Sequence, residues 1–261
     1  MSDSVLFEVD DAVATITLNR PAARNALTTH MKTGLIEALQ RCGSDTAIRS
    51  VVLTGAGTAF CAGQDLREHA EMMDRGDAPL DTVRQHYNPI ITLITTLPKP
   101  VIAALPGVAA GAGASIAFAC DFRIAGRRAS LLMAFARVGL TADSGASWTL
   151  QRLVGTARAA ELLMLAEPLS ADHAMALGLL TKVVPDDDLA GAVRELAGRL
   201  AVGPTAAYGA IKECLLYAAE HGLAKSLEKE AELQTRLGQS VDHRAATAAF
   251  LSKAEPVFHG H

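Results

Sequence analysis

Hydrophobic and polar residues alternate in two short runs near the start of the chain, VLFEV and AVATITL, on either side of Asp10 and Asp11. A period of two predicts two strands joined as a β-hairpin. The period then lengthens to that of a helix, which we expect to begin at Thr28 or Thr29. One face of this helix carries Met31, Leu35, Leu39 and Cys42.

Short apolar runs follow at intervals, and each is typical of a buried strand: SVVLTG, VIAAL, FRIA, ASLLM and TKVV. Helical segments separate them, one from about Asp65 and another over residues 81–96. This alternation predicts an α/β fold with parallel strands. After about residue 186 the strand pattern stops and the sequence is helical throughout. We therefore expect an α/β core over residues 1–200 and a C-terminal helical segment, suited to oligomerisation, over residues 201–261.

Charge, cysteine content and the apolar segments argue against several classes of protein. The 261 residues carry a formal net charge of −4, which argues against a nucleic-acid partner because such a partner favours a basic surface. Four cysteines without clustering with each other or with histidine indicate neither a metal site nor a disulfide framework. Residues 101–120 are uncharged and long enough to cross a membrane, but Pro106 and three glycines favour a buried strand, a turn and a helix. The acidic start of the chain has no apolar signal segment, so we expect a cytoplasmic protein.

Two glycine-rich stretches stand between a predicted strand and a predicted helix: FCAGQDL at residues 60–66 and GVAAGAGAS at residues 107–115. Neither contains a dinucleotide fingerprint or a phosphate-binding P-loop. Each alone is explained by a tight turn. Together, they could direct two main-chain N–H groups at one oxygen atom and so form an oxyanion hole.

One carboxylate occurs in an unusual setting. Between Thr82 and Ala160 the only acidic residues are Asp121 and Asp143, and Asp143 lies in the stretch LTADSGAS among small and apolar residues. Its position before ASWTLQRLV makes it a candidate helix cap, and its isolation makes it a candidate acid/base. Cys61, beside the first glycine turn, is a second candidate for chemistry, although free cysteine is more often a core residue.

Several of these segments together resemble one protein family. The segments LNRP, AFCAGQDL, KPVIAALPGVAAGAGASIAFACD, GLTADSGASW and FLSKAEPVF occur in the order typical of the crotonase superfamily, which comprises the enoyl-CoA hydratases and isomerases. The resemblance extends from about residue 5 to the C-terminus. It implies a spiral of ββα units followed by a helical segment, and assembly as a homotrimer or a dimer of trimers.

The resemblance also implies an acyl-CoA thioester as substrate, with no separate cofactor and no metal. The thioester oxygen would accept hydrogen bonds from the main-chain N–H groups of Ala62 and Ala112. The residues expected to bind the acyl-CoA are Arg24, Ala62, Gly63, Gln64, Asp65, Leu66, Ala112, Gly113 and Lys253.

The sequence departs from the hydratase pattern at the two positions where hydratases of this family carry glutamates. Here these positions hold Ser115 and Phe135. Asp143 occupies the place where isomerases keep their single acid/base, and its ADSGASW context most resembles the ring-1,2-epoxyphenylacetyl-CoA isomerases. A double-bond shift needs one carboxylate, so the sequence predicts an acyl-CoA isomerase that acts through Asp143 and either moves a double bond or opens an aromatic-ring epoxide. An enoyl-CoA hydratase and an acyl-CoA-binding protein without turnover are the alternatives.

Overall fold

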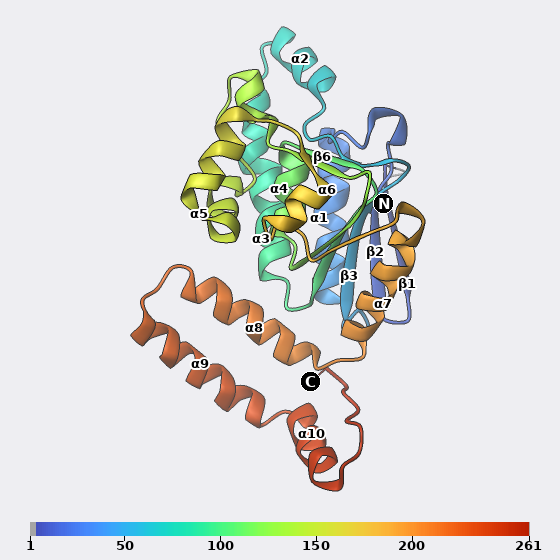
Figure 1. The fold of residues 1–261 in the computed structure, drawn as a ribbon, viewed down its shortest axis with the longest axis vertical. Helices are drawn as coiled ribbons and strands as arrows, with labels where there is room; N and C mark the ends of the chain where they lie inside the picture. The colour runs from blue at the N-terminus through green and yellow to red at the C-terminus, as the bar shows by residue number, and fades with distance from the viewer. Residues whose placement is uncertain (1–3, 261) are drawn as a thin grey trace.

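The strands and helices of the computed structural model, which describes residues 4–260, follow the predicted alternation (Figure 1). The strands are β1 (Val5–Asp10), β2 (Val13–Leu18), β3 (Ser50–Gly55), β4 (Ala59–Cys61), β5 (Val101–Leu105), β6 (Val108–Ala110), β7 (Phe122–Gly126), β8 (Ser130–Leu132), β9 (Leu169–Ser170) and β10 (Lys182–Val184). The α-helices are α1 (Thr29–Ser44), α2 (Leu66–Asp74), α3 (Asn88–Thr96), α4 (Ala112–Ala119), α5 (Ala146–Leu165), α6 (Ala171–Ala176), α7 (Leu189–Ala201), α8 (Thr205–Ala218), α9 (Leu223–Gly238) and α10 (Val241–Ser252). Shorter helical segments are η1 (Pro21–Ala23), η2 (Pro79–Asp81), η3 (Val83–Tyr87), η4 (Ala134–Val138) and η5 (Asp186–Asp188).

Two sheets organise the core. The larger has the strand order β1-β2-β3-β5-β7-β10, and the smaller has the order β4-β6-β8-β9. The predicted hairpin is β1–β2, in which Val5 lies opposite Leu18. Strands β2, β3, β5, β7 and β10 run parallel, as the alternation of strands and helices predicts.

The chain repeats one pattern as it moves across the sheets. Strand β3 enters the larger sheet, β4 enters the smaller sheet and α2 follows; β5, β6 and α4 repeat this order, and so do β7, β8 and α5. Each repeat is a ββα unit, and together the repeats form a spiral. The predicted fold class is therefore confirmed.

Alternation within each strand divides the core into two layers. On β3, Val51 and Leu53 pack into the main cluster with α1 and α3, whereas Val52 packs into a smaller cluster with α7. This follows from the period of two in a strand, which points successive side chains to opposite faces. Helix α1 begins where predicted, because the side chain of Thr28 accepts a hydrogen bond from the N–H of Met31 at 3.3 Å.

The uncharged segment 101–120 forms β5, β6 and α4, and nearly all of it is buried. Helix α4 is eight residues long. Within residues 4–260, no helix is long and apolar enough to cross a membrane.

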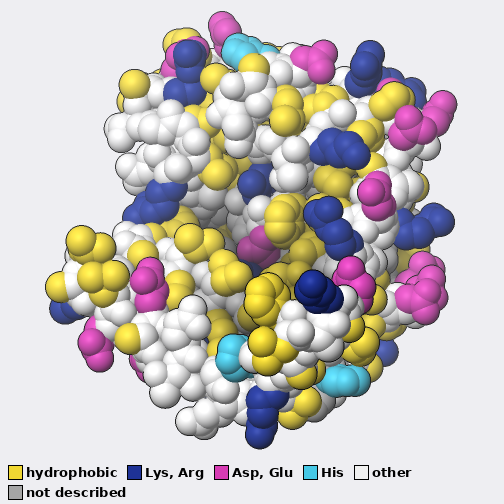
Figure 2. Space-filling model, turned by 60° about the horizontal axis from the view of Figure 1, so that its bottom comes forward, with side chains coloured by type: hydrophobic (Ala, Val, Ile, Leu, Met, Phe, Trp, Pro, Cys, Tyr) yellow, Lys and Arg dark blue, Asp and Glu magenta, His cyan; other side chains and the backbone are white. Residues whose placement is uncertain are grey.

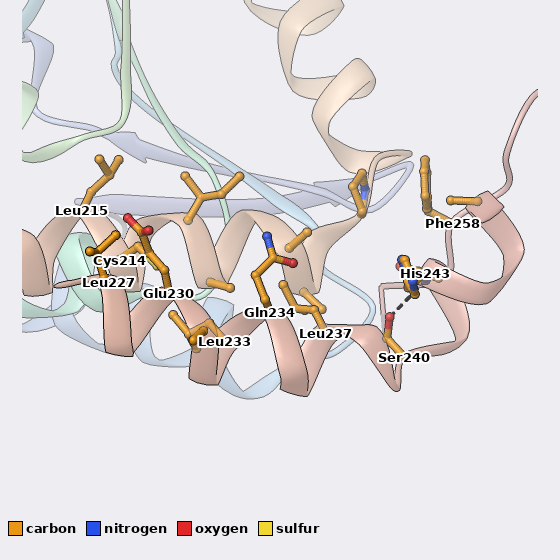
Figure 3. A pocket seen from close by; sticks show the side chains of 18 residues that line it. Cys214, Leu215, Leu227, Glu230, Leu233, Gln234, Leu237, Ser240, His243 and Phe258 are labelled. Atoms are coloured by element: carbon orange, nitrogen blue, oxygen red, sulfur yellow. Dashed lines mark hydrogen bonds between the residues drawn. The ribbon is translucent and has the colours of Figure 1, made fainter. Parts of the chain in front are cut away.

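Helices α8, α9 and α10 extend away from the two sheets (Figure 1). They enclose a hollow of about 720 Å³ with a mostly apolar lining, at one end of which the N–H of His243 donates to the hydroxyl of Ser240 at 3.0 Å (Figure 3). The side chain of Arg49 ties their base to the core through Thr205 and the carbonyls of Gly203 and Phe258. The division into residues 1–200 and 201–261 stays a prediction.

Candidate active site

The two glycine-rich turns lie side by side. Their preceding strands, β4 and β6, are parallel neighbours, so both turns leave the same edge of the smaller sheet. A Cβ atom on Gly63, whose φ is +89°, would lie 2.7 Å from the carbonyl oxygen of Ala110 and 3.4 Å from the N atom of Ala112. A Cβ atom on Gly113 would lie 2.4 Å from the carbonyl oxygen of Cys61. Only glycine permits this close approach of one turn to the other.

The N–H groups of the first turn are almost all in use. The N–H of Ala62 donates to the carbonyl of Arg24 at 3.0 Å, and those of Gly63 and Asp65 also have partners. Within residues 4–260, the N–H of Gln64 has no hydrogen-bond partner. The expected role of Ala62 as a donor to the substrate therefore needs correction, because its N–H is committed to the fold.

A planar peptide fixes the direction of the Gln64 N–H. The carbonyl of Gly63, in the same peptide unit, accepts a hydrogen bond from the N–H of Leu27 at 2.7 Å. Because the carbonyl and N–H of a trans peptide point in opposite directions, the N–H of Gln64 points away from Leu27.

The second turn supplies another unpaired donor. Ala112 is the first residue of α4, where an N–H group has no partner inside the helix. The preceding N–H, that of Gly111, donates to the carbonyl of Leu132 at 2.8 Å. In the described part of the chain the N–H of Ala112 has no partner, as the sequence-based prediction of a donor requires.

Both turns border one cavity of about 760 Å³. Its wall combines main chain from the glycine turns with apolar side chains from α2, η2, η3 and η4. The lining residues are Ala62, Gly63, Gln64, Leu66, His69, Met73, Asp77, Ala78, Pro79, Leu80, Thr82, Val83, Tyr87, Gly111, Ala112, Ala134, Phe135, Val138, Leu140 and Asp143.

Asp143 is half-buried in the wall of this cavity. Its carboxylate accepts a hydrogen bond from the hydroxyl of Ser144 at 2.7 Å. Burial raises the pKa of Asp143, and this effect outweighs the opposing influences of Ser144 and of the positive charge on Lys32. Helix α5 has Gly145 at its N-cap and no side-chain cap, so the alternative of a capping role for Asp143 is wrong.

The two positions that carry glutamates in hydratases of the family hold residues without a carboxylate here. Ser115 is buried and its hydroxyl donates to the carbonyl of Gly111 at 3.2 Å, whereas Phe135 places a ring in the cavity wall. The cavity lining contains two carboxylates, and the other one, Asp77, is exposed and paired with Arg75. Asp143 is thus the one partly buried carboxylate among the described lining residues.

A buried polar network lies directly behind the first turn. The ammonium of Lys32 donates to Gln64 Oε1 at 3.0 Å and to Thr82 Oγ1 at 2.5 Å, and the hydroxyl of Tyr87 donates to Gln64 Oε1 at 2.6 Å. This network was not predicted from the sequence. Its signal was a lysine at a position where α1 is otherwise apolar, three residues before Leu35.

Cys61 does not provide a nucleophile. It is fully buried, and burial raises the pKa of its thiol to about 12, so a negligible fraction is thiolate at neutral pH. The thiol accepts a hydrogen bond from the N–H of Gly63 at 3.4 Å. Cys61 is therefore a packing residue beneath the turn.

The structure separates the predicted binding residues into two groups. Ala62, Gly63, Gln64, Leu66 and Ala112 line the cavity. The remaining four, which do not, are Asp65, Gly113, Arg24 and Lys253.

Each residue of the second group has a different position. Asp65 caps α2, accepts the N–H groups of Arg67 and Glu68, and forms an ion pair with Arg20 at 2.8 Å. Gly113 packs against β4, and exposed Arg24 holds the first turn through its carbonyl. Lys253 is exposed at the end of α10, which Figure 1 places at the opposite end of the molecule from α2.

The family model described as "Enoyl-CoA hydratase/isomerase" matches residues 8–261. The chain belongs to the enoyl-CoA hydratase/isomerase family. It is 42% identical to the 1,2-epoxyphenylacetyl-CoA isomerase of Escherichia coli K12 over 100% of both chains. It is also 42% identical to a Rhodobacter capsulatus protein named "Probable enoyl-CoA hydratase", over 98% of both. A crystal structure of an enoyl-CoA hydratase from Polaromonas sp. JS666 superposes with a TM-score of 0.90 at 36% identity, covering 97% of this chain and 99% of the other.

Membership of the enoyl-CoA hydratase/isomerase family confirms the resemblance found in the sequence and makes this chain an enzyme whose substrate is an acyl-CoA. Similarity alone does not choose between isomerase and hydratase, because relatives of both kinds are equally similar. The choice must come from the residues in the cavity.

Proposed function

We propose that the protein is an acyl-CoA isomerase in which Asp143 carries the proton and the main-chain N–H groups of Gln64 and Ala112 hold the thioester oxygen. The observation that carries this proposal is the single partly buried carboxylate in a cavity where the two hydratase positions hold Ser115 and Phe135. The two N–H groups are unpaired within residues 4–260 and border that same cavity.

The chemistry of a double-bond shift fits one carboxylate. In a 3-enoyl thioester, Asp143 would remove a proton from Cα, and the electron pair would move onto the thioester oxygen to give a dienolate. The two N–H groups would stabilise the charge on this oxygen. The protonated carboxyl would then return the proton to Cγ, which gives the 2-enoyl thioester and restores the carboxylate. Hydration needs a water molecule to be activated and Cα to be protonated, and Ser115 and Phe135 do neither.

Opening of an aromatic-ring epoxide in an acyl-CoA is the second candidate reaction for this cavity. The specific observation in its favour is the 42% identity over the full chain to the 1,2-epoxyphenylacetyl-CoA isomerase. The apolar lining from Leu66, Met73, Val83, Phe135 and Val138 offers space for an aromatic group as well as for an aliphatic chain.

The proposal is tested by turnover of a panel of aliphatic and aromatic acyl-CoAs in heavy water. We expect migration of the double bond in 3-enoyl-CoAs or ring opening of an aryl epoxide, with deuterium appearing at Cα or Cγ in the first case. Water addition to crotonyl-CoA as the fastest reaction would show a hydratase instead. Binding of every acyl-CoA without turnover would show the third alternative, a binding protein.

The pH dependence of kcat/KM follows from the environment of Asp143. Burial raises its pKa above that of an ordinary aspartate. Because the base must be ionised to accept a proton, we expect activity to fall as the pH drops through this raised pKa. The acid limb of the kcat/KM profile should therefore lie at a higher pH than an exposed aspartate would give. A flat profile down to the usual aspartate range would contradict this assignment.

We also propose that the C-terminal helices join subunits as a homotrimer or a dimer of trimers. They expose large apolar side chains, including Leu215, Leu223, Phe250 and Leu251, the last two 82% and 78% exposed. Figure 2, which brings the lower end of the molecule forward, shows hydrophobic side chains gathered on this face. Arg24, expected from the sequence to bind the acyl-CoA, is exposed and could pair with the phosphates of CoA. Lys253 would have to serve the cavity of a neighbouring subunit, because it lies far from the cavity of its own chain.

A further inference from the structure

The ammonium group of Lys32 is a buried charge that the reaction scheme does not use. The side chain is 0% exposed, and it forms no ion pair with any carboxylate of residues 4–260. It lies on the apolar face of α1, and its Nζ atom is 5.1 Å from the centre of the Tyr87 ring. Burial lowers the pKa of Lys32, although the charges of Glu68, Asp143 and Asp65 oppose this effect. Burying an ammonium group without an ion-pair partner costs folding free energy, so a role outside stability would explain why a lysine stands at this position.

The partners of Lys32 all belong to the cavity wall. Its ammonium donates to Gln64 and Thr82, and Tyr87 donates to the same Gln64 oxygen. All three of these residues line the cavity, whereas Lys32 itself stands behind them. The network thus grips one side chain, Gln64, from two directions.

Gln64 is the residue whose main-chain N–H has no partner within residues 4–260 and is directed away from Leu27. One hydrogen bond, from Leu27 to the carbonyl of Gly63, fixes one end of this peptide unit. If the Gly63–Gln64 peptide plane pivoted on this hydrogen bond, the N–H of Gln64 would tilt away from the thioester oxygen. Holding the Gln64 side chain restrains this rotation from the other end, and a donor that is fixed in advance stabilises an oxyanion best.

We propose that Lys32 is a positioning residue of the oxyanion hole, which it orders by clamping the side chain of Gln64 together with the Tyr87 hydroxyl. This inference rests on the proposed role of the Gln64 N–H. Lys32 touches neither the substrate nor the reacting atoms.

Replacement of Lys32 should leave the fold intact. After Lys32→Met, Gln64 Oε1 keeps the Tyr87 hydroxyl, and Thr82 Oγ1 keeps its contact with His86 Nδ1 at 3.1 Å. Because Lys32 forms no ion pair within residues 4–260, its replacement by an apolar side chain of similar length removes the cost of burying the charge and leaves no buried counter-charge unpaired. We therefore expect an unchanged or higher melting temperature, which separates this role from a purely structural one.

The direct test measures the thioester carbonyl stretch of bound benzoyl-CoA by difference Raman or infrared spectroscopy. Benzoyl-CoA has no proton on the carbon next to the thioester, so no double-bond shift interferes. Bound to the wild type, its carbonyl band should move to lower frequency than in solution. In Lys32→Met and in Gln64→Ala, which keeps the N–H but removes the clamped side chain, this displacement should be clearly smaller.

Lys99→Met is the matched control. Lys99 is another buried lysine, whose ammonium donates to the carbonyls of Cys42 and Asp45 at the end of α1, outside the cavity lining. Its replacement should change stability and leave the carbonyl band of bound benzoyl-CoA at the wild-type frequency.

Turnover provides the second readout. We expect Lys32→Met to lower kcat by about ten- to a hundredfold, by analogy with the loss of the outer residues that orient metal ligands, with a much smaller change in KM. Gln64→Ala should have a similar effect. Since both changes remove one clamp, the double variant should be little worse than the poorer single variant, whereas independent roles would multiply.

The inference would be overturned if the carbonyl band of bound benzoyl-CoA had the wild-type frequency in both Lys32→Met and Gln64→Ala. It would also be overturned if the loss of kcat in the double variant equalled the product of the two single losses. These results are distinct from failure of the proposed isomerase function. The carbonyl band reports the oxyanion hole whatever reaction follows, whereas an absence of isomerisation in the wild type would overturn the function and leave the clamp standing.

Discussion

Asp143→Asn should lower the rate of double-bond migration by about a hundred- to ten-thousandfold, the usual contribution of a positioned general base. Asparagine keeps the shape of the side chain and an oxygen that can accept the Ser144 hydroxyl, which lies 2.7 Å from the native carboxylate. It cannot accept the substrate proton. Deuterium exchange at Cα and Cγ should therefore disappear together with turnover, whereas affinity for the acyl-CoA should barely change.

The stability of the same variant provides the control. Burial raises the pKa of Asp143 in the folded state, so the folded state binds the proton more tightly than the unfolded state. The ionised carboxylate then costs folding free energy above the folded pKa, and this cost is absent below the unfolded pKa. Asp143→Asn should consequently melt at an unchanged or higher temperature at neutral pH. Equal hydration of crotonyl-CoA by the variant and the wild type would mean that another group performs the chemistry.

Ala112→Pro should lower kcat/KM by about a hundred- to a thousandfold, the loss typical of one missing oxyanion donor. Proline has no N–H, and the first position of a helix is where proline is best accommodated. Ala112 is the first residue of α4, so the substitution removes the donor while the helix can still form. Rates with an active acyl-CoA and the circular dichroism spectrum would be measured together.

Ala112→Gly is the matched control, because it keeps the N–H and changes only the side chain. It should retain turnover near that of the wild type. A folded Ala112→Pro variant with full activity would show that this N–H does not hold the thioester oxygen.

The arrangement of the core could be predicted from the sequence because it depends on local patterns. The alternation in VLFEV and AVATITL gives the β1–β2 hairpin, and the helical period after Thr28 gives α1 with its predicted cap. In each case the pattern that predicts the element is also the pattern that buries it.

The details of the site depend on contacts that no local pattern contains. Ala62 looked like a donor because it lies in the glycine turn, but the carbonyl of Arg24, far from it in sequence, occupies its N–H. Asp143 looked like a helix cap because it precedes α5, but Gly145 has that position. The Lys32 clamp joins residues 32, 64, 82 and 87, whose proximity follows from the folding of three segments against each other.

The sulfur atom beneath the first turn has a chemical consequence for an enzyme of acyl-CoAs. Unsaturated thioesters are electrophiles that alkylate exposed thiolates, and a cysteine next to the site that binds them would be a target for self-inactivation. Cys61 accepts the N–H of Gly63, yet it is fully buried and burial raises its pKa to about 12. Cys42 and Cys120 are protected in the same way. These three buried thiols would therefore resist alkylation by an unsaturated thioester, even though one of them lies directly beneath the proposed oxyanion hole.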